Sequence, residues 1–349
     1  MRSPPPKIVR RLVIAPLVLL FCLAVLALSP LLLTGALVFD LARRAGRGGT
    51  RFAAFALCFA ATEAGMLVAL FLLWLASGCG LLMQSRRLRS AHYALMRGWL
   101  RCLSWAAIRL LGLRIEIVDR AEPRPGPILV FGRHAGAGNS LMMARTLMLA
   151  YRRRPRVVMI ADLQWDPVID VMCHRLPSLF IERSERFVEA IGDLARGMDD
   201  DEAFVLYPEG HDFTEKLRLR AIAHLRKDGY LAAAEQAEEM ARVLPPRHRG
   251  PLAAILAAPE ADVVMFAHTT LEELGTFRYL YRQLPLARPV KARYWRIPAA
   301  EVPHEQEALI PWLFDWWKRI DKWIEEHAPG TPRHPAKGQR AGINYGERS

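Results

Sequence analysis

The first quarter of the chain is almost continuously apolar. Residues 12–39 form one apolar run, and residues 52–83 form a second in which Glu63 is the only charged residue. Each run exceeds the ~20 residues that a helix needs to cross a bilayer, and the first is too long for the apolar core of a cleaved signal peptide. The pattern predicts an apolar helical hairpin over residues 1–85, with Pro16 and the Ser29–Pro30 step as places where its first helix can break.

From residue 115 onward, short β-rich runs alternate with helical patterns. The predicted strands are 115–118, 128–131, 157–160, 179–181, 204–207, 263–267 and 290–295. The predicted helices between them are 141–151, 167–176, 185–198 and 215–227. This alternation predicts an α/β domain over residues 86–327, with a mixed, largely buried sheet flanked by helices. We expect its functional residues at the ends of strands.

A last amphipathic helix is predicted over residues 305–327. Its apolar positions share one face and are Leu309, Trp312, Leu313, Trp316, Ile320, Trp323 and Ile324. This face fits either packing against the sheet or, because of its tryptophans, a membrane interface. The Pro, Gly and charged residues of segment 328–349 predict a disordered tail.

The cations around the hairpin favour one membrane topology without excluding another. More Lys and Arg residues flank the two ends of the hairpin than lie in the loop between its helices. This distribution places both ends in the cytoplasm if the hairpin spans the bilayer. The loop still carries Arg43, Arg44, Arg47 and Arg51. A hairpin that dips into one leaflet therefore stays open as the alternative.

The net charge indicates the kind of partner, and the cysteine content indicates the compartment. The formal net charge of +13 indicates anionic partners such as phospholipid head groups. No nucleic-acid-binding motif accompanies the charge, so nucleic acid is not expected as a partner. The five cysteines include no Cys-x-x-Cys pair, which indicates neither a disulfide framework nor a metal site. We expect a catalytic domain at the membrane, facing a reducing cytoplasm.

The first candidate site follows the predicted strand 128–131. His134 lies where the strand gives way to a turn, and Gly138 allows a close backbone approach. Asn139 or Ser140 can cap the helix that starts near residue 141. A histidine held in this way can take a proton from a hydroxyl as that hydroxyl attacks an acyl carbonyl.

The second candidate site follows the predicted strand 204–207. The sequence Pro208-Glu209-Gly210 forms a sharp turn and places a carboxylate at a strand end. Glu209 can bind a substrate hydroxyl, neutralise a nearby Arg or help to orient the site. The basic helix that follows carries Lys216, and Arg183 ends the strand 179–181 between the two sites. A guanidinium at a strand end suits a phosphate group.

In this order, the segments resemble the glycerolipid acyltransferase family typified by lysophosphatidic acid acyltransferases (1-acyl-sn-glycerol-3-phosphate acyltransferases). His134 with position 139 matches the family's His-x4-Asp motif, and residues 180–183 match its middle Phe-Ile-x-Arg-like motif. Tyr207-Pro208-Glu209-Gly210 matches its Phe-Pro-Glu-Gly motif. Segments 213–216 and 243–247 are similar to the branch that includes eukaryotic-type lysophospholipid acyltransferases. The resemblance covers about residues 125–270.

The resemblance implies a single acyltransferase domain and a membrane-bound O-acyltransferase. A fatty acyl group would pass from acyl-CoA or acyl carrier protein to the hydroxyl of a lysophospholipid, in phospholipid biosynthesis or remodelling. His134 would act as general base without an acyl-enzyme intermediate, and no metal or bound cofactor is implied. The catalytic pair would be His134 and Asn139. The substrate-binding residues would be Arg133, Gly138, Ser140, Arg183, Glu209, Gly210 and Lys216.

Two departures from the family pattern bear on activity. Asn139 stands where the family has an acid, and His211-Asp212 stands where Thr-Arg is common. An amide can fix the imidazole tautomer but cannot stabilise the imidazolium. Glu209 or Asp212 can supply the missing charge, and Asn139→Asp is expected to leave activity unchanged or raise it.

The alternative is a catalytically silent family member that binds lipid or a partner protein at the membrane. Acceptor, chain length and donor are not specified by the sequence.

Overall fold

The computed structural model describes residues 4–43, 47–118, 124–134, 137–181, 187–269, 284–286 and 288–327. The strands are β1 (Ile115–Val118), β2 (Ile128–Gly132), β3 (Arg154–Ile160), β4 (Ser178–Ile181), β5 (Glu202–Leu206), β6 (Asp262–His268) and β7 (Val290–Ile297). They form one seven-stranded sheet in the order β1-β7-β6-β2-β5-β3-β4. Neighbouring strands are parallel except β6 and β7, which are antiparallel. The predicted mixed α/β sheet is confirmed.

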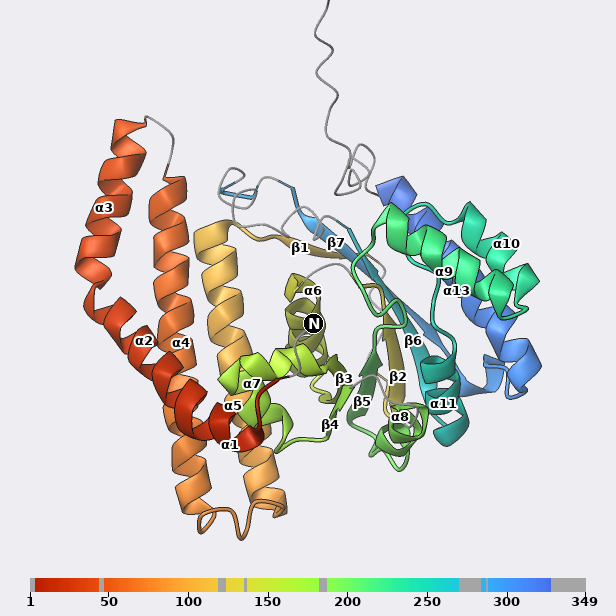
Figure 1. Cartoon of the computed structure of the whole chain (residues 1–349), viewed down its shortest axis with the longest axis horizontal. Helices are drawn as coiled ribbons and strands as arrows, with labels where there is room; N and C mark the ends of the chain where they lie inside the picture. Colours follow the sequence, from red (N-terminus) through yellow and green to blue (C-terminus); the bar gives the residue numbers. More distant parts are fainter. Residues whose placement is uncertain are drawn as a thin grey trace, which may run out of the picture.

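Helices cover both faces of the sheet (Figure 1). One side carries α5 (Arg86–Ala106), α6 (Ala137–Arg145) and α7 (Pro167–Cys173). The other carries α8 (Phe187–Ala195), α9 (Glu215–Lys227), α10 (Leu231–Glu239), α11 (Arg249–Ala257) and α13 (Gln306–His327). Sequence patterns missed α5, α10 and α11. Because both faces are covered, every residue of β2 and β5 is buried.

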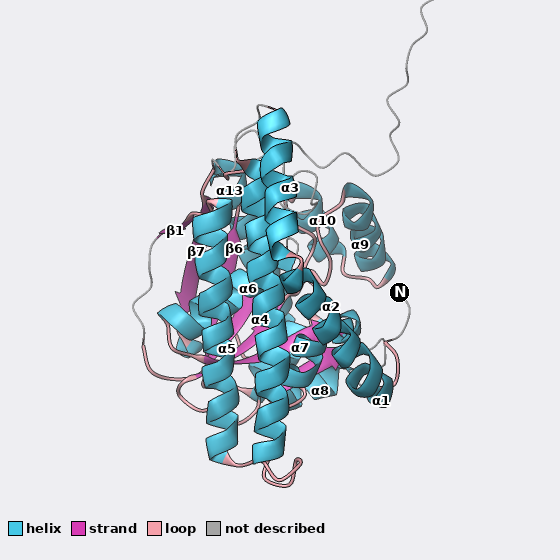
Figure 2. Cartoon of the chain, turned by 90° about the vertical axis from the view of Figure 1, so that its left-hand side faces the viewer, coloured by secondary structure: helices cyan, strands magenta, loops and turns pink. Residues whose placement is uncertain are grey.

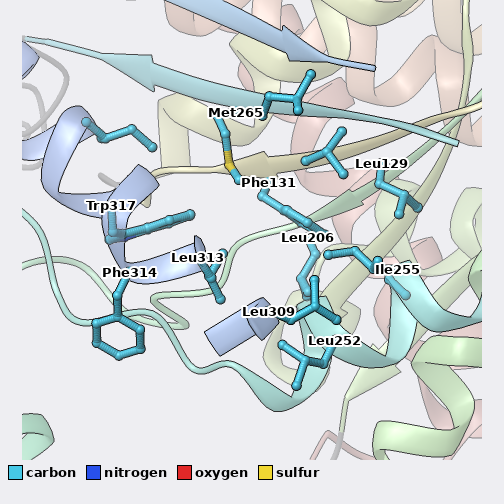
Figure 3. Packing of buried hydrophobic residues seen from close by; sticks show 14 of the residues in the cluster. Leu129, Phe131, Leu206, Leu252, Ile255, Met265, Leu309, Leu313, Phe314 and Trp317 are labelled. Atoms are coloured by element: carbon cyan, nitrogen blue, oxygen red, sulfur yellow. The ribbon is translucent and has the colours of Figure 1, made fainter. Parts of the chain in front are cut away.

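The larger core lies between the sheet and helix α13. Leu129 and Phe131 of β2 point toward this side, while Ile128 and Val130 belong to the core on the other face, as the two-residue period of a strand requires. Figure 3 shows Leu309, Leu313 and Trp317 of α13 packed beside these strands. Trp317 is fully buried, so the apolar face of the last helix packs against the sheet.

The first arm of the amino-terminal hairpin is not one continuous helix. A π-helical turn over Arg10–Ile14 follows the short α1 (Lys7–Val9), and α2 (Ala15–Ala27) and α3 (Ser29–Ala42) follow in turn. The break at residue 28 falls at the predicted Ser29–Pro30 step, where proline can begin a helix but not continue one. The return helix is α4 (Gly48–Ala76). By length and apolar composition, Lys7–Ala27 and Gly48–Ala76 could each cross a membrane.

The hairpin shares a core with the catalytic domain. Helix α4 packs lengthwise against α5 (Figures 1 and 2), and Leu70 of α4 lies in one cluster with Tyr93 of α5 and Val171 of α7. The fully buried carboxylate of Asp170 binds both Arg10 and Arg11, with N–O distances of 3.0 Å and 2.8 Å. The boundary predicted at residue 86 therefore separates segments of different composition that are packed as one body.

Candidate active site

The two candidate segments meet at one edge of the sheet. Strands β2 and β5 are parallel neighbours, with Phe131 opposite Leu206 near their carboxyl ends. The chain therefore leaves both strands side by side, and parallel sheets place ligand sites at this edge. Gly132 makes the junction possible, because a Cβ atom there would lie 2.8 Å from the ring of Tyr207. The Tyr207 ring in turn meets the His134 ring edge to face, with centroids 5.4 Å apart.

His134 is held through both its backbone and its ring. Its backbone N–H donates to Oε1 of Glu209 at 3.1 Å. Its Nδ1 lies 2.7 Å from Oδ1 of Asp212. The His134 side chain is 27% exposed and that of Asp212 is 61% exposed. The imidazole is therefore held through Nδ1 while part of the ring faces solvent.

Glu209 joins three segments beneath the histidine. Oε2 of Glu209 accepts the backbone N–H of Leu244 at 3.0 Å, and Oε1 accepts that of His134. The side chain is only 2% exposed. Burial raises the pKa of Glu209 to about 7, while the charge of Arg133 and the two backbone N–H groups act in the opposite direction. Of the predicted roles, orienting the site and neutralising an Arg fit this placement better than binding a substrate hydroxyl.

Arg133 points into the protein. Its guanidinium donates to the backbone oxygens of His268 at 2.9 Å and Arg242 at 3.0 Å, and the residue is 2% exposed. This differs from the predicted substrate contact, because the side chain connects the end of β6 to the segment before α11. Arg133 supplies the positive charge that offsets the buried Glu209.

Asn139 lies in the first turn of α6, because that helix begins at Ala137 and not near residue 141. Its Nδ2 donates to the backbone oxygen of Arg133 at 2.6 Å, and the residue is fully buried. Within the described part of the chain, its Oδ1 has no hydrogen-bond partner. The predicted contact between position 139 and the imidazole is therefore replaced by one from Asp212. Gly138 and Ser140 are exposed beside it.

Asn139→Asp is expected to destabilise the protein, a cost that the motif alone does not indicate. A carboxylate at position 139 cannot donate to the Arg133 oxygen, and its charge would lie in a buried place. The cost should be about 1–3 kcal/mol. Thermal unfolding of the detergent-solubilised variant measures it, with the exposed neighbour substitution Ser140→Asp as the stability control. An unchanged unfolding midpoint would show that position 139 tolerates the charge.

Of the remaining predicted residues, Gly210 and Lys216 follow β5 in the chain. Gly210 has a φ of +68°, a left-handed conformation that glycine adopts without strain. The guanidinium carbon of Arg247 lies 3.4 Å from where a Gly210 Cβ atom would be. Lys216 is exposed on the first turn of α9, and Arg183 lies outside the described residues. In the described ranges, no three His, Cys, Asp or Glu side chains are grouped to hold a metal.

Sequence reasoning left open whether Glu209 or Asp212 supplies the missing charge, and it missed the role of segment 240–247. The signal for Asp212 was its departure from the family pattern two residues after Gly210. Segment 240–247 gave a weaker signal, because its contribution is made through backbone groups: the Leu244 N–H, the Arg242 oxygen, and the Arg247 N–H that donates to Pro208 at 3.0 Å.

The structure has a mixed sheet with a histidine held at the carboxyl end of a central strand. The comparison with protein families identifies the class of protein that has this domain. Residues 114–283 match the family model described as Acyltransferase. This part of the chain is therefore an acyltransferase domain, and the protein is an acyltransferase.

Among solved structures, the chain is similar to the crystal structure of the 1-acyl-sn-glycerophosphate (LPA) acyltransferase PlsC from Thermotoga maritima. The identity is 11% and the TM-score is 0.43, with 75% of this chain and 96% of that chain covered. No match was found among curated proteins.

Proposed function

We propose that this acyltransferase transfers a fatty acyl group from acyl-CoA or acyl carrier protein to the hydroxyl of a lysophospholipid, with His134 as general base. The observation that carries the proposal is the partly exposed imidazole at the end of β2 in an acyltransferase domain. Its Nδ1 is engaged by Asp212, so Nε2 is the nitrogen that can meet an acceptor hydroxyl. Because a carboxylate accepts hydrogen bonds, we place the imidazole proton on Nδ1, where it faces Asp212.

In the proposed reaction, the imidazole of His134 accepts one proton and later donates it again. Nε2 takes the proton of the acceptor hydroxyl as the oxygen attacks the thioester carbonyl. The carbon–sulfur bond then breaks, and the leaving thiolate takes the proton from the imidazolium. His134 is thereby regenerated, and the products are an ester and a free thiol. Glu209 exchanges no proton in this scheme, because both its oxygens bind backbone N–H groups.

Cations beside the turn after β5 are suited to the phosphate of the acceptor. Arg247 covers Gly210 with its guanidinium and is exposed, and Lys216 is exposed in the first turn of α9. A guanidinium binds phosphate through paired hydrogen bonds. We assign Arg247 and Lys216 to phosphate binding, together with the predicted Arg183. The exposed Gly138 and Ser140 stay as predicted contacts to substrate.

The apolar hairpin is proposed to hold the enzyme on the cytoplasmic face of a membrane by inserting into one leaflet. Its outward surface includes Phe21, Leu31 and Phe71, all exposed. A spanning α4 would carry the neighbouring α5 into the hydrocarbon, where exposed Arg86, Arg87 and Arg101 would be costly. All five cysteines are free, in keeping with a reducing compartment.

Labelling of a cysteine at the loop between α3 and α4 tests the membrane placement. With the native cysteines replaced, Arg47→Cys is expected to react with a membrane-impermeant maleimide added to the side that carries the catalytic domain. A hairpin that lies in one leaflet with its helices along the membrane surface keeps this loop on that side. Protection there, with labelling from the opposite side, would establish a spanning hairpin. Arg196→Cys, at the exposed residue that directly follows α8, is the positive control.

A panel assay tests the proposed reaction. Purified protein in lipid vesicles, incubated with labelled acyl-CoA or acyl carrier protein and a set of lysolipids, is expected to form diacylated product with a phosphate-bearing acceptor. Each acceptor is paired with a monoacylglycerol of the same chain length, which should be a poorer substrate because it cannot engage the cations. Binding without turnover on every acceptor would instead favour a silent lipid-binding protein.

A further inference from the structure

We propose that Asp212 is the carboxylate that positions His134, in place of a residue on helix α6. This inference rests on the proposed role of His134 as general base. Asp212 is a positioning residue, because it acts on substrate only through the imidazole. It would fix the tautomer and stabilise the imidazolium that forms during transfer, as an acid does in hydrolase triads.

The contact itself has the geometry of a strong hydrogen bond. Nδ1 of His134 and Oδ1 of Asp212 are 2.7 Å apart, at the short end of the range for a nitrogen donor and an ionised oxygen. The amide of Asn139 is turned to the Arg133 carbonyl and carries no charge. Glu209 is already bound to two backbone N–H groups. Of these three candidate partners, Asp212 alone contacts the imidazole ring.

The chain holds Asp212 between two fixed points. On one side, Gly210 closes a turn by donating its N–H to the Tyr207 oxygen at 3.1 Å. On the other side, Thr214 caps α9 by accepting the Leu217 N–H at 3.2 Å. Only three residues lie between Gly210 and Thr214, so the position of Asp212 follows from these anchors. The carboxylate is thus placed by the turn after β5 and the start of α9.

Exposure determines how large the effect should be. The Asp212 side chain is 61% exposed, and exposed ion pairs are weak because water and salt screen them. Bound lipid would exclude water from the site, and the same contact would then be stronger. The effect of removing Asp212 should therefore fall on the chemical step, with little effect on the stability of the free protein.

Steady-state kinetics of Asp212→Ala and Asp212→Asn test the proposal on the best acceptor of the panel. We expect kcat to fall roughly 10- to 10³-fold in the alanine variant, which is less than the ~10⁴-fold loss known for a buried triad acid. Asn keeps an acceptor oxygen but no charge and should be intermediate. The KM for the acceptor should stay within about threefold, since uniform binding is unaffected. Unfolding midpoints should match that of the wild type.

The control is Asp193→Asn, since Asp193 of α8 is 60% exposed and also contacts a basic side chain, that of Arg196. It is expected to leave kcat unchanged. Asp212 variants with kcat within twofold of the wild type would overturn the proposal, as would an unchanged kcat with a tenfold higher KM. Full activity in His134→Ala, measured in the same series, would instead refute the proposed function.

Discussion

Replacing His134 by alanine is expected to abolish acyl transfer. The imidazole is the base at the strand end in the proposed reaction, and the neighbouring Glu209 already accepts two backbone N–H groups. Loss of a general base costs about 10²–10⁴ in rate, so kcat should fall by a factor of this size. Product formation by purified protein in vesicles measures the loss. Normal turnover would remove His134 from the mechanism.

His174→Ala is a matched control for this experiment. The His174 side chain is 30% exposed, and its Nδ1 also lies near a carboxylate, 3.2 Å from Asp170. It differs in position, since it follows helix α7 and stacks on Phe180. Activity should be retained in this variant. Flotation with vesicles should be unchanged in both variants, because neither histidine belongs to the exposed apolar surface of α2 to α4.

The fold could be predicted because its signals are local. Each predicted strand is present, since β-rich runs bounded by turn residues indicate strands without knowledge of their neighbours. Helix α5 was missed because its apolar residues contact α4 and α7 while Arg and Ser residues interrupt the pattern. The path of the hairpin was also not predictable from composition. It depends on contacts with the catalytic domain, such as those of Asp170 with Arg10 and Arg11.

The location of the site could be predicted from the sequence, but the contacts between its side chains could not. The strand-end positions of His134 and Glu209 follow from sequence, because parallel strands bring their carboxyl ends together. Which carboxylate reaches the imidazole depends on where α6 starts and on the turn at Gly210. Helix α6 begins at Ala137, which turns Asn139 inward. A one-turn difference in the start of a helix is beyond what sequence patterns resolve.

The buried Glu209 gives the second large effect. Glu209→Ala would leave the backbone N–H groups of His134 and Leu244 without their acceptors. Each unsatisfied buried group costs about 1–3 kcal/mol, so the free energy of unfolding should fall by several kcal/mol. Transfer should also fall, because the backbone of His134 loses its anchor. Guanidinium unfolding in detergent, combined with the vesicle assay, measures both. Wild-type stability would contradict a structural role for this carboxylate.

Glu209→Gln separates charge from hydrogen bonding through pH. Burial raises the pKa of Glu209 to about 7 from an ordinary 4.5, so between these values the folded state binds more protons than the unfolded state. Stability must then decrease as pH rises through this window, by up to about 3 kcal/mol. Glutamine cannot ionise, so the variant should lack this decrease. Glu235→Gln, exposed on α10, should keep it. Equal pH dependence in wild type and Glu209→Gln would show that Glu209 does not titrate in this range.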